Sequence, residues 1–157
     1  MPLRVEDHDR VRLLVLNDAP RRNALSLELV EAIVDACDAA EDDPGVAALV
    51  LTGEPPAFCS GADVSSLASM SERGAAGDAD GDRGLRRVYE GFLRVLRSPL
   101  PTVAAVNGPA VGAGLNLALA CDVRVAAVSA RFDSRFLSLG LHPGGGHTWL
   151  LERAVGP

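Results

Sequence analysis

Four short apolar runs, at residues 11–16, 46–52, 102–106 and 123–127, predict the strands of a layered α/β fold. The two middle runs, VAALVLT and TVAAV, are apolar almost throughout instead of alternating with polar residues. A continuous apolar run of this length is typical of a strand that is covered on both faces. We therefore expect both faces of these two strands to be buried.

Between the strands, apolar residues recur at three- and four-residue spacing, which predicts helices. Ser26 is a good N-cap for the first helix, whose apolar stripe includes Val30, Ile33 and Cys37. A second stripe lies within residues 85–96, and the prolines at 99 and 101 end its helix. A third helix, at about 113–120, is apolar on nearly all sides and is expected to be buried. The alternation of strands and helices favours parallel pairing within one domain over residues 1–157.

Residues 70–84 break this pattern, because MSERGAAGDADGDRG is rich in glycine, alanine and aspartate and has no periodicity. We predict a mobile surface loop in this region. The loop is either an inert insertion or a lid over a binding site.

Charge and composition exclude several classes of protein. The net charge is −6 and no basic stretch is long enough to track a phosphate backbone, so we expect no nucleic-acid partner. No apolar run approaches membrane-spanning length, and the N-terminus is too charged for a signal peptide, so we expect no membrane partner. Cys37, Cys59 and Cys121 lie far apart in apolar stretches and are expected to be buried thiols in a reducing cytoplasm. The scattered histidines do not form a metal-binding motif.

Two glycine-containing turns each follow an apolar strand: FCSGAD at 58–63 and NGPAVGAG at 107–114. Glycine allows backbone to approach a ligand closely, and a helix N-terminus offers unpaired N–H groups. Two such turns can form an oxyanion hole, with two N–H donors on one developing negative oxygen. From spacing alone, ordinary packing turns are the alternative. A dinucleotide fingerprint, a P-loop and a nucleophile elbow are all missing from the sequence.

These segments together resemble the signature blocks of the crotonase (enoyl-CoA hydratase/isomerase) family. FCSGAD is followed by PTVAAVNGPAVGAGLNLALACDVRVAA and then by ARFDSRFLSLGLHPGGG, and LNDAPRRNALS resembles the family's opening turn. The blocks occur in the family's order and cover residues 11–157.

The resemblance implies a fold made of a spiral of ββα units and subunits that form trimers or pairs of trimers. It also implies an acyl-CoA thioester as ligand, with coenzyme A entering as part of the substrate and no permanently bound cofactor. The backbone N–H groups of Ala62 and Ala113 take the positions of the oxyanion-hole donors. Family chains normally continue into C-terminal helices, so we expect this chain to lack that region and to associate with other chains.

The resemblance further places a set of residues around the substrate: Arg21, Arg22, Ala24, Ser60, Gly61, Asp63, Val64, Val111 and Gly112. Arg21 and Arg22 are either partners of the CoA phosphates or solvated surface arginines. Asp63 and Asp122 match family positions that we interpret as structural.

The two catalytic glutamates of the family's hydratases are replaced by Asn116 and Phe136. Neither an amide nor a phenyl ring can act as a general acid or base. Asn116 either hydrogen-bonds the acyl group or a water, or is a satisfied polar residue in a buried helix. Phe136 would make the acyl end of the pocket more apolar.

Other residues near these blocks are candidate acids or bases. His147 follows a glycine run and is predicted to start a helix, where the dipole favours neutral imidazole. Asp133 and His142 are further candidates, and capping or surface roles are the alternative for all three. The sequence therefore supports an acyl-CoA hydratase or isomerase with an altered acid–base group, a non-catalytic acyl-CoA-binding relative, or a structural subunit that needs partner chains.

Overall fold

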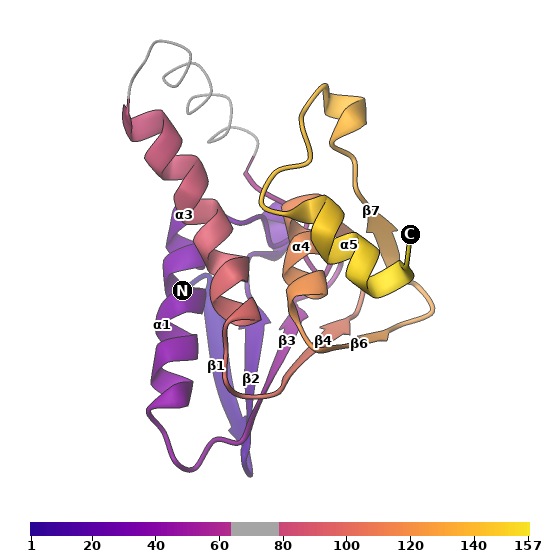
Figure 1. Ribbon diagram of the computed structural model, residues 1–157. Coiled ribbons are helices and arrows are strands. Elements are labelled where there is room, and N and C mark those ends of the chain that lie inside the picture. The colour runs from indigo at the N-terminus through magenta and orange to yellow at the C-terminus, as the bar shows by residue number, and fades with distance from the viewer. Residues whose placement is uncertain (64–78) are drawn as a thin grey trace.

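The computed structural model describes residues 1–63 and 79–157, and its main element is a five-stranded sheet (Figure 1). The strands are β1 (Leu3–His8), β2 (Val11–Leu16), β3 (Ala48–Gly53), β4 (Thr102–Val106) and β6 (Val123–Ala126), in the order β1-β2-β3-β4-β6. β2, β3, β4 and β6 pair in parallel, as predicted, and β1 pairs antiparallel with β2. The predicted strands all exist, but β1 was not predicted. Its sequence, LRVEDH, has only two apolar residues, which fits a strand in which four of the six residues are exposed.

Four α-helices accompany the sheet in the described part of the chain: α1 (Leu27–Glu41), α3 (Ala79–Leu96), α4 (Ala113–Ala120) and α5 (His147–Val155). Short 3-10 helices occur at Ala19–Arg21 and Leu137–Leu139. α1 packs against α3 and the first two strands, α3 packs against α4, and α4 packs against α5. The hydroxyl of Ser26 accepts a hydrogen bond from the Leu29 amide at 3.2 Å, so the predicted N-cap is confirmed. None of the described helices is long and apolar enough to span a bilayer.

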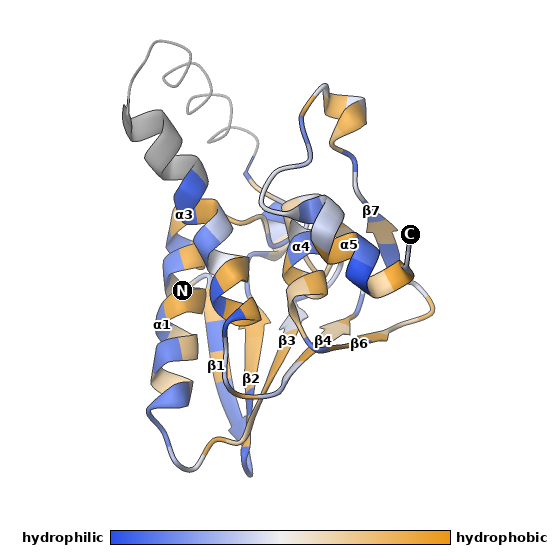
Figure 2. Ribbon diagram, in the orientation of Figure 1, coloured by the Kyte–Doolittle hydropathy of each residue, from blue (hydrophilic) through white to orange (hydrophobic). Residues whose placement is uncertain are grey.

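The core lies between the sheet and these helices. It includes Leu51 of β3, Ile33 of α1, Phe92 of α3 and Leu117 of α4, all fully buried. Figure 2 shows the same division, with β2 largely hydrophobic and the exposed strand β1 largely hydrophilic. All eight residues of α4 are buried, as its uniformly apolar sequence predicts.

The expectation that β3 and β4 are fully buried on both faces is wrong for this chain. Both strands alternate, with Leu49 and Leu51 of β3 fully buried and Ala48, Val50 and Thr52 only half-buried. The described helices cover one face of these strands, so the apolar residues on the opposite face keep part of their exposure.

The predicted loop at 70–84 also needs correction. Residues 70–78 lie outside the described part, but α3 begins at Ala79, so residues 79–84 are helical and not a loop. Once the apolar stripe of α3 is packed, each further helical residue adds a hydrogen bond without a new nucleation cost. Propagation from the packed turns therefore extends the helix into a sequence that lacks periodicity of its own.

Candidate active site

A second, two-stranded parallel sheet carries the candidate site. It consists of β5 (Pro109–Val111) and β7 (Arg131–Asp133), with Val111 opposite Asp133. The glycine-containing turn after β3 joins this sheet through Cys59, which forms a bridge with Ala110. The Cys59 amide donates to Pro109 O at 3.1 Å, and the Val111 amide donates to Cys59 O at 3.0 Å. The two turns singled out in the sequence therefore lie side by side.

Two glycines allow this close approach. Gly61 has φ +101°, and a methyl group added there would lie 2.8 Å from Val111 O and 3.7 Å from the Ala113 nitrogen. A methyl group at Gly114 would lie 2.3 Å from Cys59 O, closer than any side chain can approach. Only glycine fits at these positions, and the peptide that follows Gly61 is thereby held next to the start of α4.

The amides of Ala62 and Ala113 are the two predicted donors. The amide next to each of them in the chain already donates a hydrogen bond. Asp63 N donates to Leu25 O at 3.3 Å, and Gly112 N donates to Asp133 O at 2.8 Å. Among the turn and cap hydrogen bonds of residues 1–63 and 79–157, neither Ala62 N nor Ala113 N has an acceptor. Ala113 is the first residue of α4, where a helix leaves its N–H groups unpaired. Within the described part of the chain, the two predicted donors thus lie in adjacent turns without a backbone acceptor.

The opening turn is fastened to the first of these turns by Asn23. Its side chain is fully buried and donates to the carbonyl oxygens of Glu54 and Ala57, both at 2.8 Å, while its Oδ1 accepts from Asp18 N at 2.9 Å. The Ser60 hydroxyl donates to Arg21 O at 3.0 Å, which adds a second connection. Asn23 was not singled out in the sequence, because an isolated asparagine in a turn gives no signal of long-range contacts.

The two arginines of the opening turn have different surroundings. The Arg21 guanidinium pairs with Asp18 at 2.6 Å and lies 3.5 Å from Asp63, and the hydrogen bond to Asp18 raises its pKa. Arg22 is exposed in a left-handed conformation, φ +53°, and its guanidinium has no hydrogen bond or ion pair with any described residue. Of the two predicted phosphate partners, Arg21 is paired with carboxylates, whereas the Arg22 guanidinium has no partner in residues 1–63 and 79–157. Ala24, another predicted contact, is buried just behind this turn.

A chain of hydrogen bonds links three side chains beside the second turn. His147 lies at the start of α5, as predicted, and is 4% exposed. Its Nδ1 is 2.6 Å from Oδ1 of the buried Asn116 on α4, and its Nε2 is 2.9 Å from the hydroxyl of Ser134. The Asn116 amide nitrogen donates to Gly144 O at 3.3 Å.

These contacts define the tautomer of His147. Because the Asn116 oxygen can only accept, Nδ1 carries the hydrogen, and the lone pair of neutral Nε2 accepts the Ser134 hydroxyl hydrogen. Burial lowers the pKa of His147, which favours the neutral ring that this arrangement requires. Asn116 therefore orients the imidazole, and its polar atoms are satisfied within the protein.

A cavity of about 420 Å³ opens at the Ser134 end of this chain. Its walls include Phe136, Leu137 and Pro143 together with Ser134 and His147, and the Phe136 ring lies 4.8 Å from the imidazole, centroid to centroid. The position of the family's second glutamate therefore presents an apolar ring to the cavity.

The other acid–base candidates are placed less favourably. Asp133 lines the cavity, but its carboxylate accepts hydrogen bonds from the backbone and guanidinium of Arg135 at 2.9 and 3.0 Å. His142 is exposed and is not among the residues that line the cavity. Asp122 accepts from the backbone and hydroxyl of Thr102, both at 2.8 Å, which agrees with a structural role.

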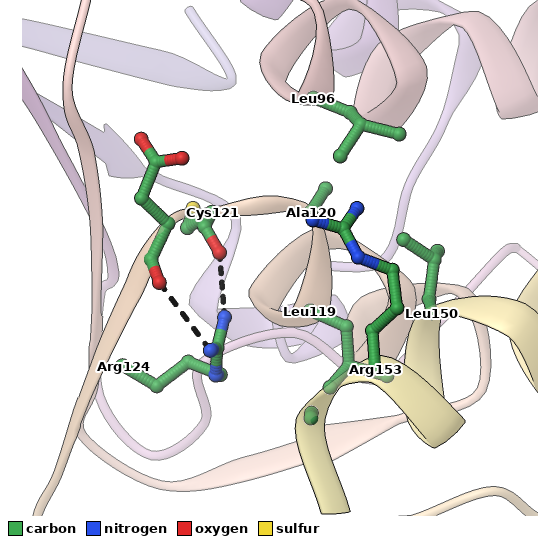
Figure 3. Close-up of a pocket in the computed structure, with 9 residues that line it drawn as sticks. Leu96, Leu119, Ala120, Cys121, Arg124, Leu150 and Arg153 are labelled. Carbon is green, nitrogen blue, oxygen red and sulfur yellow. Dashed lines mark hydrogen bonds between the residues drawn. The ribbon is translucent and has the colours of Figure 1, made fainter. Parts of the chain in front are cut away.

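A separate cavity of about 240 Å³ lies at the opposite end of α4, between the ends of α3 and α5 (Figure 3). There Arg124 donates to the carbonyl oxygens of Cys121 and Asp122, at 2.5 and 3.4 Å. An eight-residue helix is about 12 Å long, so this cavity is distant from the predicted donors. Arg124 hydrogen-bonds carbonyl groups at the C-terminal end of α4 and therefore caps that end of the helix.

The structure places the predicted residues in two groups. Gly61, next to Ala62, lies against Val111 and the start of α4 at Ala113. His147 contacts Asn116 and Phe136. Val64 lies outside the described residues. Ser134 was not predicted, because a serine within ARFDSRF carries no sequence signal of a contact with a histidine thirteen residues away.

Comparisons with known proteins agree with this fold. A putative enoyl-CoA hydratase/isomerase (crotonase) from Legionella pneumophila superposes with a TM-score of 0.88 at 31% identity, over 99% of this chain and 58% of that chain. A putative enoyl-CoA hydratase from Streptomyces coelicolor gives a TM-score of 0.83 at 39% identity, over 99% of this chain and 56% of that chain. The fold is therefore that of the crotonases, as the sequence blocks predicted.

The model of the enoyl-CoA hydratase/isomerase family matches residues 6–157, and the chain belongs to this family. A probable enoyl-CoA hydratase of Mycobacterium tuberculosis is 54% identical over 155 residues, which are 99% of this chain and 57% of the relative. The human mitochondrial methylglutaconyl-CoA hydratase is 36% identical over 152 residues, which are 96% of this chain and 43% of the relative. The chain thus spans about half the length of these relatives.

Proposed function

We propose that this chain binds an acyl-CoA thioester and acts as an enoyl-CoA hydratase or isomerase. The carrying observation is the pair of adjacent turns whose Ala62 and Ala113 amides have no acceptor among the described residues. A thioester oxygen placed between them receives two hydrogen bonds that strengthen as negative charge develops on it. One donor of this kind contributes about 3–4 kcal/mol to lowering the barrier.

His147 supplies the acid–base chemistry in this proposal. Asn116 and Phe136 occupy the positions of the family's glutamates, and neither side chain can donate or accept a proton near neutral pH. His147 lines the larger cavity, and the Asn116 oxygen accepts from Nδ1, so the lone pair of the neutral ring is on Nε2, beside Ser134. The apolar wall around Phe136 suits the acyl chain.

The CoA moiety is proposed to bind at the opening turn, where the Arg22 guanidinium is free to contact a phosphate. We also propose that the chain works in the cytoplasm, in a trimer or a pair of trimers. Exposed apolar side chains on and beside β6 and β7, namely Val123, Val125, Val128 and Phe132, support burial against other chains.

A second candidate is an acyl-CoA-binding protein without hydratase activity. The contacts of Asn116 favour it, because its amide nitrogen and its oxygen each already have a partner within the protein. In this case the two N–H groups hold the thioester, and no proton is transferred.

Turnover and binding assays separate the two candidates. Crotonyl-CoA and longer enoyl-CoAs are assayed for loss of the conjugated double bond, and calorimetry measures binding of the saturated analogues. Turnover that is lost in His147→Gln supports the enzyme, and binding without turnover supports the binding protein. The proposal is wrong in both forms if no CoA ester binds.

A further inference from the structure

We propose that Ser134 is a nucleophile that cleaves acyl-CoA thioesters, with His147 as its base and Asn116 as the residue that orients the base. This inference rests on the proposed acyl-CoA site and adds a second reaction to it, hydrolysis of the thioester. It assigns a catalytic role to a residue outside the glutamate positions of the family.

The hydrogen-bond geometry is that of a nucleophile–base–orienter arrangement. The Ser134 hydroxyl is 2.9 Å from His147 Nε2, and Nδ1 of the same ring is 2.6 Å from the Asn116 oxygen. Since the Asn116 oxygen can only accept, Nε2 is the acceptor and the serine hydroxyl is the donor, which is the direction that activates a hydroxyl. Serine, histidine and an oxygen-bearing third residue in this order catalyse acyl transfer on unrelated folds.

Ser134 also lies beside a proposed oxyanion donor. Its preceding residue, Asp133, accepts the hydrogen bond of Gly112 N at 2.8 Å, and the next amide along the chain is that of Ala113. A methyl group added at Gly112 would lie 4.0 Å from Ser134 O. β5 and β7 therefore hold the hydroxyl-bearing residue against the start of α4. Ser134 and His147 both line the larger cavity, so substrate can reach the hydroxyl from that side.

The polar groups next to the Ser134–His147–Asn116 hydrogen bonds do not compete with the reaction. Asp133 is occupied by Arg135, and Phe136 covers the imidazole with an apolar ring. The hydroxyl of Ser138, the next serine along the chain, donates to Arg135 O at 2.8 Å. Ser134 is therefore the serine whose hydroxyl hydrogen-bonds the imidazole in the described part of the chain.

The proposed reaction has two balanced steps. In the first, Ser134 Oγ attacks the thioester carbonyl carbon while its proton moves to His147 Nε2. The carbon–sulfur bond then breaks, and the imidazolium returns the proton to the leaving CoA thiolate, which leaves an acyl ester on Ser134. In the second step, His147 takes a proton from water, the hydroxide attacks the ester, and the proton returns to Ser134 as the carboxylic acid leaves. The Ala62 and Ala113 amides stabilise the oxyanion in both steps.

The test uses butyryl-CoA, whose saturated chain cannot be hydrated or isomerised at a double bond. Free thiol is followed spectroscopically, and peptide mass spectrometry after an acid quench locates the butyryl group. We expect thiol release, a butyryl mass on the peptide containing Ser134, and labelling of the same serine by a fluorophosphonate reagent. These readouts on the unaltered chain need no variant to fold.

Variants then assign the roles. Ser134→Ala and His147→Gln should each lower thiol release by at least ~10²-fold. Calorimetric binding of butyryl-CoA should persist in Ser134→Ala. Ser134→Cys, which keeps a nucleophile, should retain measurable acylation. Ser129→Ala is the matched control, because the Ser129 hydroxyl donates to the backbone oxygen of Asn107 and Ser129 is not among the residues that line the cavity.

The outcomes separate this inference from the proposed function. Thiol release in Ser134→Ala equal to that of the parent overturns the nucleophile, as does butyryl-CoA binding with neither thiol release nor fluorophosphonate labelling. Either result leaves the proposed acyl-CoA site in place. Failure of butyryl-CoA and of crotonyl-CoA to bind at all overturns both.

Discussion

Nδ1 of His147 and Oδ1 of Asn116 lie 2.6 Å apart in the buried junction between α4 and α5, although thirty-one residues separate them in sequence. The partner of the histidine at this contact is a neutral carboxamide and not a carboxylate. A carboxylate there would attract the protonated ring, whereas the amide only orients the neutral one.

The variant Asn116→Asp should therefore raise the pKa of His147. The new carboxylate would lie against Nδ1 and favour the imidazolium form, so Nε2 would carry a proton near neutral pH. NMR titration of the imidazole resonance measures the shift, with the signal of exposed His142 as an internal reference. A His147 pKa that is unchanged or lower in this variant would contradict the contact between residue 116 and the imidazole.

Stability should depend on pH through His147. Burial places its folded-state pKa below the ordinary value of 6.5, so the unfolded chain binds the proton more readily than the folded chain. The histidine therefore favours folding above about pH 6.5, and this contribution declines as the pH falls through that value until the folded-state pKa is reached. Urea unfolding at a series of pH values, compared with His147→Gln, measures it. In His147→Gln, the free energy of unfolding should lack this decline with falling pH.

The proposed donor at residue 113 can be removed with little change to the fold. Ala113 is the first residue of α4, where proline is well accommodated, so Ala113→Pro deletes the N–H but keeps the helix. We expect turnover of any acyl-CoA substrate to fall by about 10²–10³-fold. Ala113→Gly retains the N–H and is the control. Equal turnover in the two variants would argue against an oxyanion role.

Binding of the CoA phosphates should depend on Arg22. Arg22→Ala is expected to weaken binding of a CoA ester by roughly tenfold at low salt, and by less at high salt, because charges on an exposed arginine are screened. Arg10→Ala, which removes an exposed arginine in the turn between β1 and β2, is the control. Calorimetry at two salt concentrations makes the comparison, and equal affinities of the two variants would exclude Arg22 as the phosphate contact.

Asn23 should be among the most important polar residues for stability. Asn23→Ala removes the donor to the carbonyl oxygens of Glu54, Ala57 and Phe58, the last two of them in buried contacts, which should lower the free energy of unfolding by about 2–4 kcal/mol. Asn17→Ala, which removes one exposed hydrogen bond at 3.3 Å, should change it by less than about 0.5 kcal/mol. Chemical denaturation of both variants tests this difference.

Local patterns in the sequence predicted most of the fold. Apolar runs located β2, β3, β4 and β6, the stripe on α3 agreed with the burial of Val88, Phe92 and Val95, and Ser26 marked the start of α1. β1 was missed because a strand at the edge of a sheet needs few apolar residues. The start of α3 was placed too late, since helix propagation depends on packing elsewhere in the helix and not on the residues being added.

The candidate site was predictable only where a motif reports backbone geometry. Gly61 and Gly114 occupy positions that no other residue fits, so these glycines in the sequence predict the two turns. Ser134, Asn116 and His147 come from three separate segments, and nothing within each segment specifies that their side chains meet. Long-range side-chain contacts of this kind depend on the packing of α4, α5 and the strand β7.

The pairing of β5 with β7 limits how this protein can be redesigned. Val111 of β5 is in register with Asp133 of β7. The positions of the next residues, Gly112 after β5 and Ser134 after β7, therefore depend on each other. A change of acyl preference introduced by lengthening or shortening the chain before residue 134 would displace the start of α4 as well. Substitutions at Phe136 or Leu137, beyond the paired residues, offer a way to alter the cavity while leaving that register intact.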